Sequence, residues 1–222
     1  MAQYRWRPVQ EADRPFLSWM YELTETYGDE SLPLPDYYPR AYRDYVGRWL
    51  ASEGGVILEA TDLSQSERVA FDSDIRRRDP FDPGFDRQAA FSAAAILPLA
   101  DAPSDAATLR AGSGAGAPNV EPAVPVGAAW LRFFTPQDAR YGHVADGIPE
   151  IAVAIRPGAV DNGLSEPLLE GLFEWAKAQG HPGVSLAVDV ANPRAARAYE
   201  KRGFVYVKTV KEGQYNVMLK EF

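Results

Sequence analysis

The chain has 222 residues, of which 46% are hydrophobic, and 23 basic against 31 acidic residues give it a formal net charge of -8. This length buries a substantial core and predicts one domain with an insertion rather than two full domains. The acidic balance disfavours general binding to nucleic acid or to an anionic membrane, and it is compatible with cationic substrates. The chain has no cysteine, which excludes disulfides, thiolate metal sites and a cysteine nucleophile.

Targeting and metal signals are weak throughout the sequence. Residues 1–7 lack the apolar core of a signal peptide, and no run approaches the roughly 20 apolar residues that span a bilayer. We therefore expect a cytoplasmic protein with no membrane partner. The two histidines, His143 and His181, have no ligand-like spacing, so we expect no metal cofactor.

The first part of the chain predicts a strand, two helices and a second strand. Residues 4–8 form the first strand, and Asp13 is the expected N-cap of the first helix. Apolar residues at three- and four-residue spacings predict a second helix over residues 42–50, which Gly54 helps to end. Residues 56–60 predict the second strand.

A long insertion follows the second strand. The next convincing strand covers residues 126–134. Residues 61–125 therefore connect two strands that a hairpin loop of a few residues would be able to join. The last part, residues 99–125, is rich in Ala, Gly, Pro and Ser and has little to bury. We expect a largely irregular insertion.

The remainder of the chain alternates between strands and helices. Residues 151–155 and 184–189 predict strands, and a helix between them ends at Gly180. Two final strands flank a turn at residues 211–214. The core face of that helix is expected to comprise Leu168, Leu169, Leu172, Phe173 and Ala176. This order predicts an α/β fold with a mixed sheet and helices on both faces.

The segment from Asn192 to Phe204 holds a helix start, one tyrosine, a helix stop and a strand start. Asn192 is a good N-cap, and Pro193 suits the first helical position because its missing N–H costs nothing there. Gly203 suits the left-handed residue that ends a helix. About two turns later, Tyr199 lies on roughly the same side of this short helix as Asn192 at its N-terminus. For any one residue the alternative is an ordinary capped helix with a tyrosine buried for packing.

In this order and spacing, these residues resemble the end of the GNAT acyltransferase fold. The resemblance is best from about residue 128 to the C-terminus, weaker over the first sixty residues and absent from the insertion. It implies a single acetyltransferase domain over residues 1–222, with a central mixed sheet and an insertion between the second and third strands. It also implies that acetyl-coenzyme A sits where two neighbouring parallel strands, 151–155 and 183–189, separate.

The resemblance also implies a set of cofactor-binding residues. Backbone groups of Val153, Ala154 and Ile155 would hold the pantetheine arm and thioester and could steady an oxyanion; the alternative is a plain buried strand. The loop that follows would wrap the pyrophosphate at a helix N-terminus. Its candidate residues are Asp161, Asn162, Gly163, Leu164, Ser165 and Glu166.

This loop departs from the family pattern Gln/Arg-x-x-Gly-x-Gly/Ala. Only Gly163 matches strictly, because Val160 and Ser165 replace the first and last positions. Asp161 and Glu166 place carboxylates beside the expected pyrophosphate, where a like-charge pair at about 6 Å costs roughly 0.7 to 3 kcal/mol. The alternative interpretation is a helix N-terminus that has lost strong cofactor affinity.

The resemblance assigns the catalytic roles as well. Tyr199 matches the general acid that protonates the departing thiolate, since a phenol stays protonated at neutral pH. Asn192 matches the position that hydrogen-bonds the pantetheine. Glu150 is the preferred general base for the amine and Asp189 the second candidate, and for each carboxylate the alternative is simple solvation.

These expectations combine into one functional hypothesis. The chain is expected to transfer acetyl from acetyl-coenzyme A to a primary amine, on a small molecule or a peptide, by direct attack and without metal. The alternative is a catalytically weak sensor that binds acyl-coenzyme A, or a protein-interaction module. GNAT-like proteins often dimerise through their C-terminal strands, so a homodimer is also considered.

Overall fold

The computed structural model describes residues 3–61, 123–157, 159 and 163–222. The strands are β1 (Gln3–Pro8), β2 (Gly55–Thr61), β3 (Val124–Arg132), β4 (Glu150–Ile155), β5 (Gly183–Asp189), β6 (Val205–Val210) and β7 (Tyr215–Glu221). The α-helices are α1 (Arg14–Glu25), α2 (Tyr38–Tyr42), α5 (Ser165–Ala178) and α6 (Pro193–Glu200). Short 3-10 turns cover Glu11–Asp13 and Ala51–Glu53, and a π-helical turn covers Arg43–Gly47.

The described strands form one seven-stranded mixed sheet in the order β1-β2-β3-β4-β5-β7-β6. Every neighbouring pair is antiparallel except β4 and β5, which are parallel. β2 ends at Thr61 and β3 begins at Val124, so the predicted insertion does lie between the second and third strands. The insertion itself, residues 62–122, lies outside the described residues. The predicted mixed α/β fold is confirmed.

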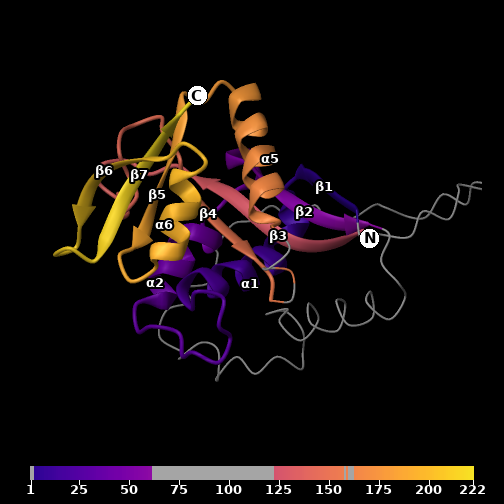
Figure 1. Ribbon diagram of the computed structural model, residues 1–222, viewed down its shortest axis with the longest axis horizontal. Coiled ribbons are helices and arrows are strands. Elements are labelled where there is room, and N and C mark those ends of the chain that lie inside the picture. The colour runs from indigo at the N-terminus through magenta and orange to yellow at the C-terminus, as the bar shows by residue number, and fades with distance from the viewer. Residues whose placement is uncertain (1–2, 62–122, 158, 160–162) are drawn as a thin grey trace, which may run out of the picture.

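Side chains of the sheet alternate between two hydrophobic layers, one on each face. On one face, Ile151 of β4 packs in a layer with α5 residues such as Leu168. On the other, Ala152 and Trp130 pack in a layer with α1 residues such as Leu17. In Figure 1, α5 and α6 cover the face turned to the viewer, and α1 and α2 lie behind the sheet. Helices therefore cover both faces, as predicted.

Two local predictions in the first part of the chain were wrong. Asp13 precedes α1, but its side chain makes no cap bond to that helix. Its carboxylate instead accepts hydrogen bonds from both Arg7 terminal nitrogens and from the backbone N–H of Gln10. The second helix ends in the π-helical turn at Gly47. Leu50, expected on its apolar face, is 59% exposed.

Gly54 occupies a position that no other residue should tolerate. Its φ is +87°, and an added Cβ would overlap the Trp175 ring of α5. We expect Gly54→Ala to lower the free energy of unfolding by about 3 kcal/mol, because a left-handed backbone costs roughly 1–2 kcal/mol and the clash adds a similar amount. Urea unfolding measures this loss.

Gly28 provides the matched control for Gly54. Its φ is +84°, and a Cβ there would meet no described atom within 4 Å. Gly28→Ala should therefore show the backbone cost alone, about 1–2 kcal/mol. Equal losses for the two variants would show that the Trp175 contact does not constrain Gly54.

Among the described residues, no helix is both long enough and apolar enough to cross a membrane.

Candidate functional site

The parallel strands β4 and β5 pair at one position and then separate. Glu150 pairs with Ser185, and the Ser185 N–H donates to the Pro149 carbonyl at 2.9 Å. Within these two fully described strands, no further residue of β4 pairs with β5, although each strand continues to pair with its other neighbour. Figure 1 shows the two strands diverging from this point. We call the unpaired stretch, residues 151–155 and 186–189, the β4–β5 split.

Backbone direction decides which amides of β4 face the split. The Pro149 carbonyl points toward β5, whereas the Arg156 N–H donates to the Val126 carbonyl on the β3 side at 3.0 Å. The backbone N–H and C=O groups of successive residues point to alternate sides of a strand. The N–H and C=O groups of Val153 and Ile155 therefore point toward the split, and those of Ala154 point toward β3. Of the three residues expected to offer backbone groups, two are thus placed to do so.

The two candidate catalytic side chains approach the sheet from opposite faces. Tyr199 of α6 packs against the hydrophobic layer under α5. The Glu150 side chain contacts Tyr45, which packs against the layer under α1. The split interrupts the sheet between these faces. The candidate acid and the candidate base thus lie on opposite faces of the sheet.

Glu150 is a buried carboxyl with an unusual environment. Its side chain is 3% exposed, and Oε1 accepts hydrogen bonds from the Tyr45 hydroxyl at 2.5 Å and from the Gly142 N–H at 3.1 Å. Oε2 is buried without a hydrogen-bond partner among the described residues. Burial raises the pKa of Glu150 to about 7, although both hydrogen bonds and the charge of Arg140 oppose the shift. A carboxyl poised near neutral pH suits a general base.

Neither Tyr45 nor Gly142 was singled out from the sequence as a partner of Glu150. Gly142 allows the close approach, because a Cβ there would overlap the Glu150 carboxylate. Tyr45 is held by stacking on Tyr21, with ring centres 5.2 Å apart. The contact spans 105 positions in the chain, so no local spacing signals it. A glycine eight residues before the candidate base was the one available hint, and it is a weak one.

Tyr199 is partly buried beside Phe204, with ring centres 5.5 Å apart at 66°. Burial raises the pKa of Tyr199 to about 12, and the charge of Arg202 opposes this shift. The phenol is therefore fully protonated at neutral pH. A protonated hydroxyl at the edge of the split is able to donate a proton or a hydrogen bond to a ligand there.

Asn192 and Asp189 have structural partners of their own. Asn192 Oδ1 accepts from the Ala195 N–H at 3.1 Å, which confirms the predicted N-cap of α6. The Asn192 amide nitrogen remains a donor that capping does not use. Asp189, the second candidate base, accepts from the Tyr27 hydroxyl at 2.9 Å and from the Ala191 N–H at 2.8 Å. These bonds make Asp189 a structural anchor of the turn after β5, and Glu150 stays the preferred candidate base.

The loop before α5 is described from Gly163 onward, so Asp161 and Asn162 lie outside the described residues. Gly163 has φ +71°, and a Cβ there would meet no described atom within 4 Å. Leu164 is buried in the core, while Ser165 begins α5. In this first turn the Glu166 N–H donates to the Gly163 carbonyl at 3.3 Å, and Pro167 has no N–H. The helix dipole nevertheless favours an anion at this end of α5.

Glu166, the carboxylate expected to repel a pyrophosphate, has a basic neighbour. Arg202 Nη2, at the end of α6, lies 3.6 Å from Glu166 Oε2. The ion pair is weak because Glu166 is 65% exposed. It nevertheless brings a guanidinium to the N-terminus of α5, which the sequence did not reveal because Arg202, in the turn after α6, is 36 positions from Glu166. A basic group is thus present where the loop itself lacks one.

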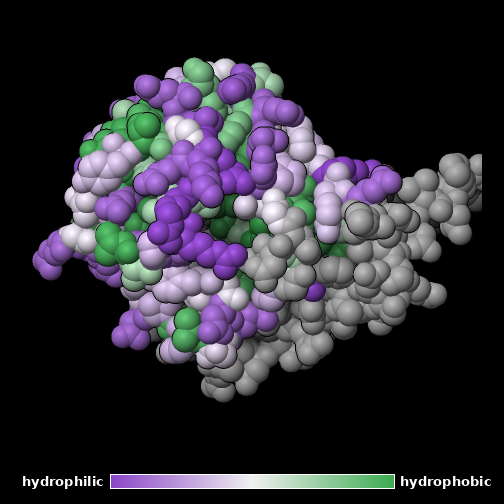
Figure 2. Space-filling view, viewed as in Figure 1, coloured by the Kyte–Doolittle hydropathy of each residue, from purple (hydrophilic) through white to green (hydrophobic). Residues whose placement is uncertain are grey.

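The surface beside α6 is hollowed. Figure 2 shows a recess with a hydrophobic floor next to the hydrophilic surface that covers this helix. The α6 residues Arg194, Arg197 and Glu200 are exposed, whereas Ala195 and Ala196 pack inward. An apolar floor with a polar rim is typical of sites that bind elongated organic ligands.

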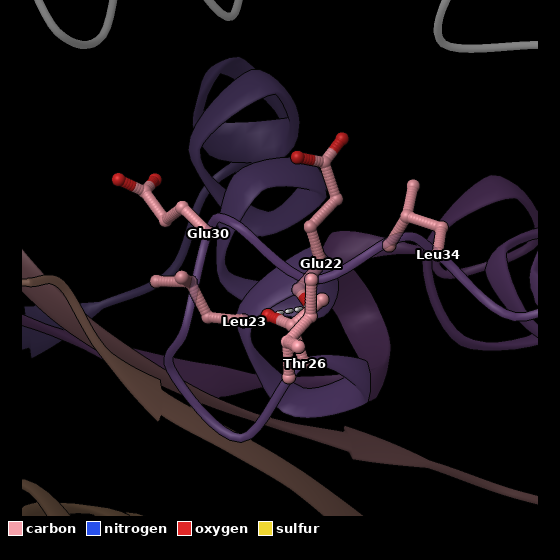
Figure 3. A pocket seen from close by; sticks show the side chains of 6 residues that line it. Glu22, Leu23, Thr26, Glu30 and Leu34 are labelled. Carbon is pink, nitrogen blue, oxygen red and sulfur yellow. Dashed lines mark hydrogen bonds between the residues drawn. The ribbon is translucent and has the colours of Figure 1, made fainter.

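A pocket also lies on the other face of the sheet, at the end of α1. Its lining residues are Glu22, Leu23, Thr26, Glu30, Leu32 and Leu34. Figure 3 shows the Glu22 and Glu30 carboxylates extending to the same side of this pocket. Glu30 also accepts from Trp19 Nε1 at 2.9 Å. The pocket gives this face of the protein a local negative charge.

Part of the chain is similar to a known protein family. Residues 106–204 match the acetyltransferase (GNAT) family, and no curated protein sequence matches the chain. This part of the chain therefore resembles GNAT acetyltransferases. This match covers less than half of the sequence and includes β3, β4, α5, β5 and α6, the elements that build the split.

Solved structures share the fold of this chain over almost its whole length. A GCN5-related N-acetyltransferase from Kribbella flavida has a TM-score of 0.53 and 12% identity, covering 99% of this chain and 98% of its own. A GNAT-family acetyltransferase from Listeria monocytogenes 4b F2365 has a TM-score of 0.51 and 11% identity, covering 99% of this chain and 95% of its own. A domain from Methanocaldococcus jannaschii DSM 2661 has a TM-score of 0.52 and 11% identity, covering 100% of both chains. At these identities the similarity shows the fold alone.

The GNAT assignment gives the split a chemical meaning. Family and fold together support acyl transfer as the general activity of the chain. The GNAT match also begins at residue 106, inside the segment that we had predicted to lack any resemblance.

Proposed function

We propose that this GNAT protein transfers acetyl from acetyl-coenzyme A to a primary amine by direct attack. The observation that carries the proposal is the β4–β5 split, with Glu150 reaching it from the α1 side and Tyr199 flanking it on the α5 side. The buried Glu150 oxygen without a hydrogen-bond partner among described residues supports a role in proton transfer, because such groups are otherwise rare in cores.

The site fits the shape and charge of acetyl-coenzyme A. The N–H groups of Val153 and Ile155 face the split and are placed to bind the pantetheine amides and the thioester oxygen. The first turn of α5, entered through the left-handed Gly163, directs the positive end of the helix dipole toward the proposed pyrophosphate position. Arg202 adds a positive charge beside that turn. Asp161, Asn162 and Glu166 belong to the same proposed loop.

In the proposed reaction, the neutral amine nitrogen attacks the thioester carbonyl carbon. Glu150 accepts a proton from the amine, through a water molecule because the carboxyl is buried. The carbon–sulfur bond then breaks, and Tyr199 protonates the departing thiolate. The products are an N-acetylated amine and free coenzyme A. The Asn192 amide nitrogen is proposed to bind the pantetheine while its oxygen caps α6.

Calorimetry with acetyl-coenzyme A, followed by turnover with a panel of amines, tests the proposal. We expect saturable binding at micromolar to millimolar donor and release of coenzyme A that depends on the amine. Binding without turnover on any amine would favour an acyl-coenzyme A sensor, for which the departure of residues 160–165 from the GNAT pattern is the supporting observation. Absence of binding at millimolar acetyl-coenzyme A would rule out both the acetyltransferase and the acyl-coenzyme A sensor.

A further inference from the structure

Three tyrosines that have no role in the proposed reaction surround one ammonium group. Lys211 Nζ lies 4.9, 5.1 and 5.3 Å from the ring centres of Tyr37, Tyr141 and Tyr215. The Tyr141 and Tyr215 rings stack at 4.9 Å and 17°, and the hydroxyls of Tyr37 and Tyr215 are 3.4 Å apart. Ring faces attract cations within about 6 Å of their centres. We call these three rings the tyrosine cage.

The tyrosine cage is assembled from distant segments and opens to solvent. Tyr37 precedes α2, Tyr141 lies between β3 and β4, and Tyr215 begins β7. Tyr37 and Tyr141 are each 41% exposed. Rings gathered only to stabilise the fold would be expected to bury more of their apolar surface. Their open arrangement around a charge is instead typical of sites that bind organic cations.

The tyrosine cage borders the proposed catalytic site. Tyr141 is followed directly by Gly142, whose N–H donates to Glu150 Oε1 at 3.1 Å. Tyr215 pairs with Asp189 at the carboxyl end of β5, where that strand has parted from β4. A ligand whose reacting amine is close to Glu150 can therefore extend a second group toward the cage.

Lys211 occupies the cage from a backbone position that seldom suits a lysine. Its φ is +51°, and the φ of the next residue, Glu212, is +55°. Side chains rarely adopt this left-handed conformation. This conformation belongs to the turn that joins β6 to β7, so the hairpin fixes the backbone of Lys211 beside the cage.

The charge around the tyrosine cage also favours cations. Residues 22–38, which include Tyr37, contain five acidic and no basic residues. These acidic residues are Glu22, Glu25, Asp29, Glu30 and Asp36. Such a concentration of one sign attracts oppositely charged ligands and raises their association rate.

We propose that the tyrosine cage binds a second ammonium group of the acceptor, and that Lys211 occupies it as a tethered competitor when no acceptor is present. The inference rests on the proposed function and narrows its substrate to alkyl diamines and polyamines. The reacting amine loses its proton toward Glu150, while the distant ammonium stays charged against the three rings. A monoamine has no group for the cage.

Titration with tetramethylammonium chloride tests the cage without any turnover. Chemical-shift changes would be followed in the wild type, Lys211→Met and Lys208→Met, with sodium chloride matching the ionic strength. Lys208 lies on β6 of the same hairpin, but its ammonium donates to the His143 carbonyl at 3.3 Å. We expect Lys211→Met to bind about three- to ten-fold more tightly than the other two. Tyr37→Leu, added to Lys211→Met, should abolish that gain. Equal affinity in all variants would overturn the proposal.

Turnover separates this proposal from the proposed function. We expect Lys211→Met to lower KM for 1,4-diaminobutane about three- to ten-fold and to leave KM for butylamine unchanged. If Lys211→Met alters both amines equally while acetylation proceeds, the cage role fails and the proposed function stands. If no variant acetylates either amine, the proposed function and the acceptor role both fail, and the titration alone decides whether the cage binds cations.

Discussion

Glu150→Gln should lower kcat/KM for amine acetylation by about 10²- to 10³-fold, the usual contribution of a general base. Glutamine keeps the shape of the side chain and an oxygen that accepts from Tyr45 and Gly142, but it cannot take a proton. Affinity for acetyl-coenzyme A should stay within about twofold, since Glu150 has no proposed contact with the donor. Glu174→Gln, an exposed carboxylate of α5, is the matched control and should behave as the wild type.

The pH dependence gives an independent check on Glu150. Its pKa is raised to about 7, and the ionised form is the base. Wild-type kcat/KM, calculated per concentration of neutral amine, should therefore rise about tenfold per pH unit below pH 7 and level off above it, while the residual rate of Glu150→Gln should lack this step. A wild-type profile that is flat between pH 5.5 and 8 would contradict the assignment.

Folding stability should show the same titration with a definite sign. Because the Glu150 pKa is raised from 4.5 to about 7 on folding, the folded state binds this proton more tightly. The resulting stabilisation is complete below pH 4.5 and is lost as the pH rises through about 7. Between pH 4.5 and 8, the free energy of unfolding of Glu150→Gln should gain about 3 kcal/mol relative to the wild type. Urea unfolding at both pH values measures the difference.

Tyr199→Phe should slow acetyl transfer by about 10- to 100-fold while leaving donor affinity within about twofold. The substitution removes only the hydroxyl, so the contact with Phe204 and the packing of α6 should survive. The expected loss of rate is smaller than for Glu150→Gln, because burial raises the pKa of Tyr199 to about 12. This value lies well above that of a thiol near 8.5, so the phenol is a weak acid toward the thiolate.

A second tyrosine provides the control for this variant. Tyr206 lies on β6, is 59% exposed, and has its hydroxyl 2.9 Å from Thr209 Oγ1. Tyr206→Phe should leave the rate unchanged. Single-turnover measurements are needed so that chemistry, and not product release, is observed. An unchanged single-turnover rate in Tyr199→Phe would show that another acid or solvent protonates the thiolate.

Local signals predicted the C-terminal part of the fold well. Asn192 caps α6 as expected, and Gly203 has the left-handed φ of +84° that ends the helix. These features depend on neighbours within a few residues, which the sequence displays directly. The predicted parallel pair, 151–155 and 183–189, likewise corresponds to β4 and β5. The separation of these strands was implied by the GNAT resemblance rather than by their residues.

Predictions failed where distant contacts override local patterns. Apolar spacing over residues 42–50 predicted a regular helix, but the π-helical turn shifts the helical phase after Tyr42 and leaves Leu50 exposed. Trp49 is buried all the same, without belonging to a helix. Asp13 was expected to cap α1, yet the guanidinium of Arg7 on β1 binds its carboxylate. An ion pair between elements is not visible in spacing.

The candidate site was predicted only in part for the same reason. Glu150 and Tyr199 were identified from the family resemblance, but the environment that tunes each of them comes from elsewhere in the chain. Tyr45 reaches Glu150 across 105 positions, and Arg202 lies beside Glu166 through the approach of two helices. Sequence patterns name candidate reactive groups, whereas only the fold shows which neighbours influence their pKa values and charges.

Amide hydrogen exchange along β4, resolved by residue with and without saturating acetyl-coenzyme A, tests the central claim most directly. If the donor binds in the β4–β5 split, exchange should slow by at least about tenfold at Val153 and Ile155, whose N–H groups face it. Ala154, already directed toward β3, should change little. Saturation of the protein by the donor without added protection at Val153 and Ile155 would contradict the account.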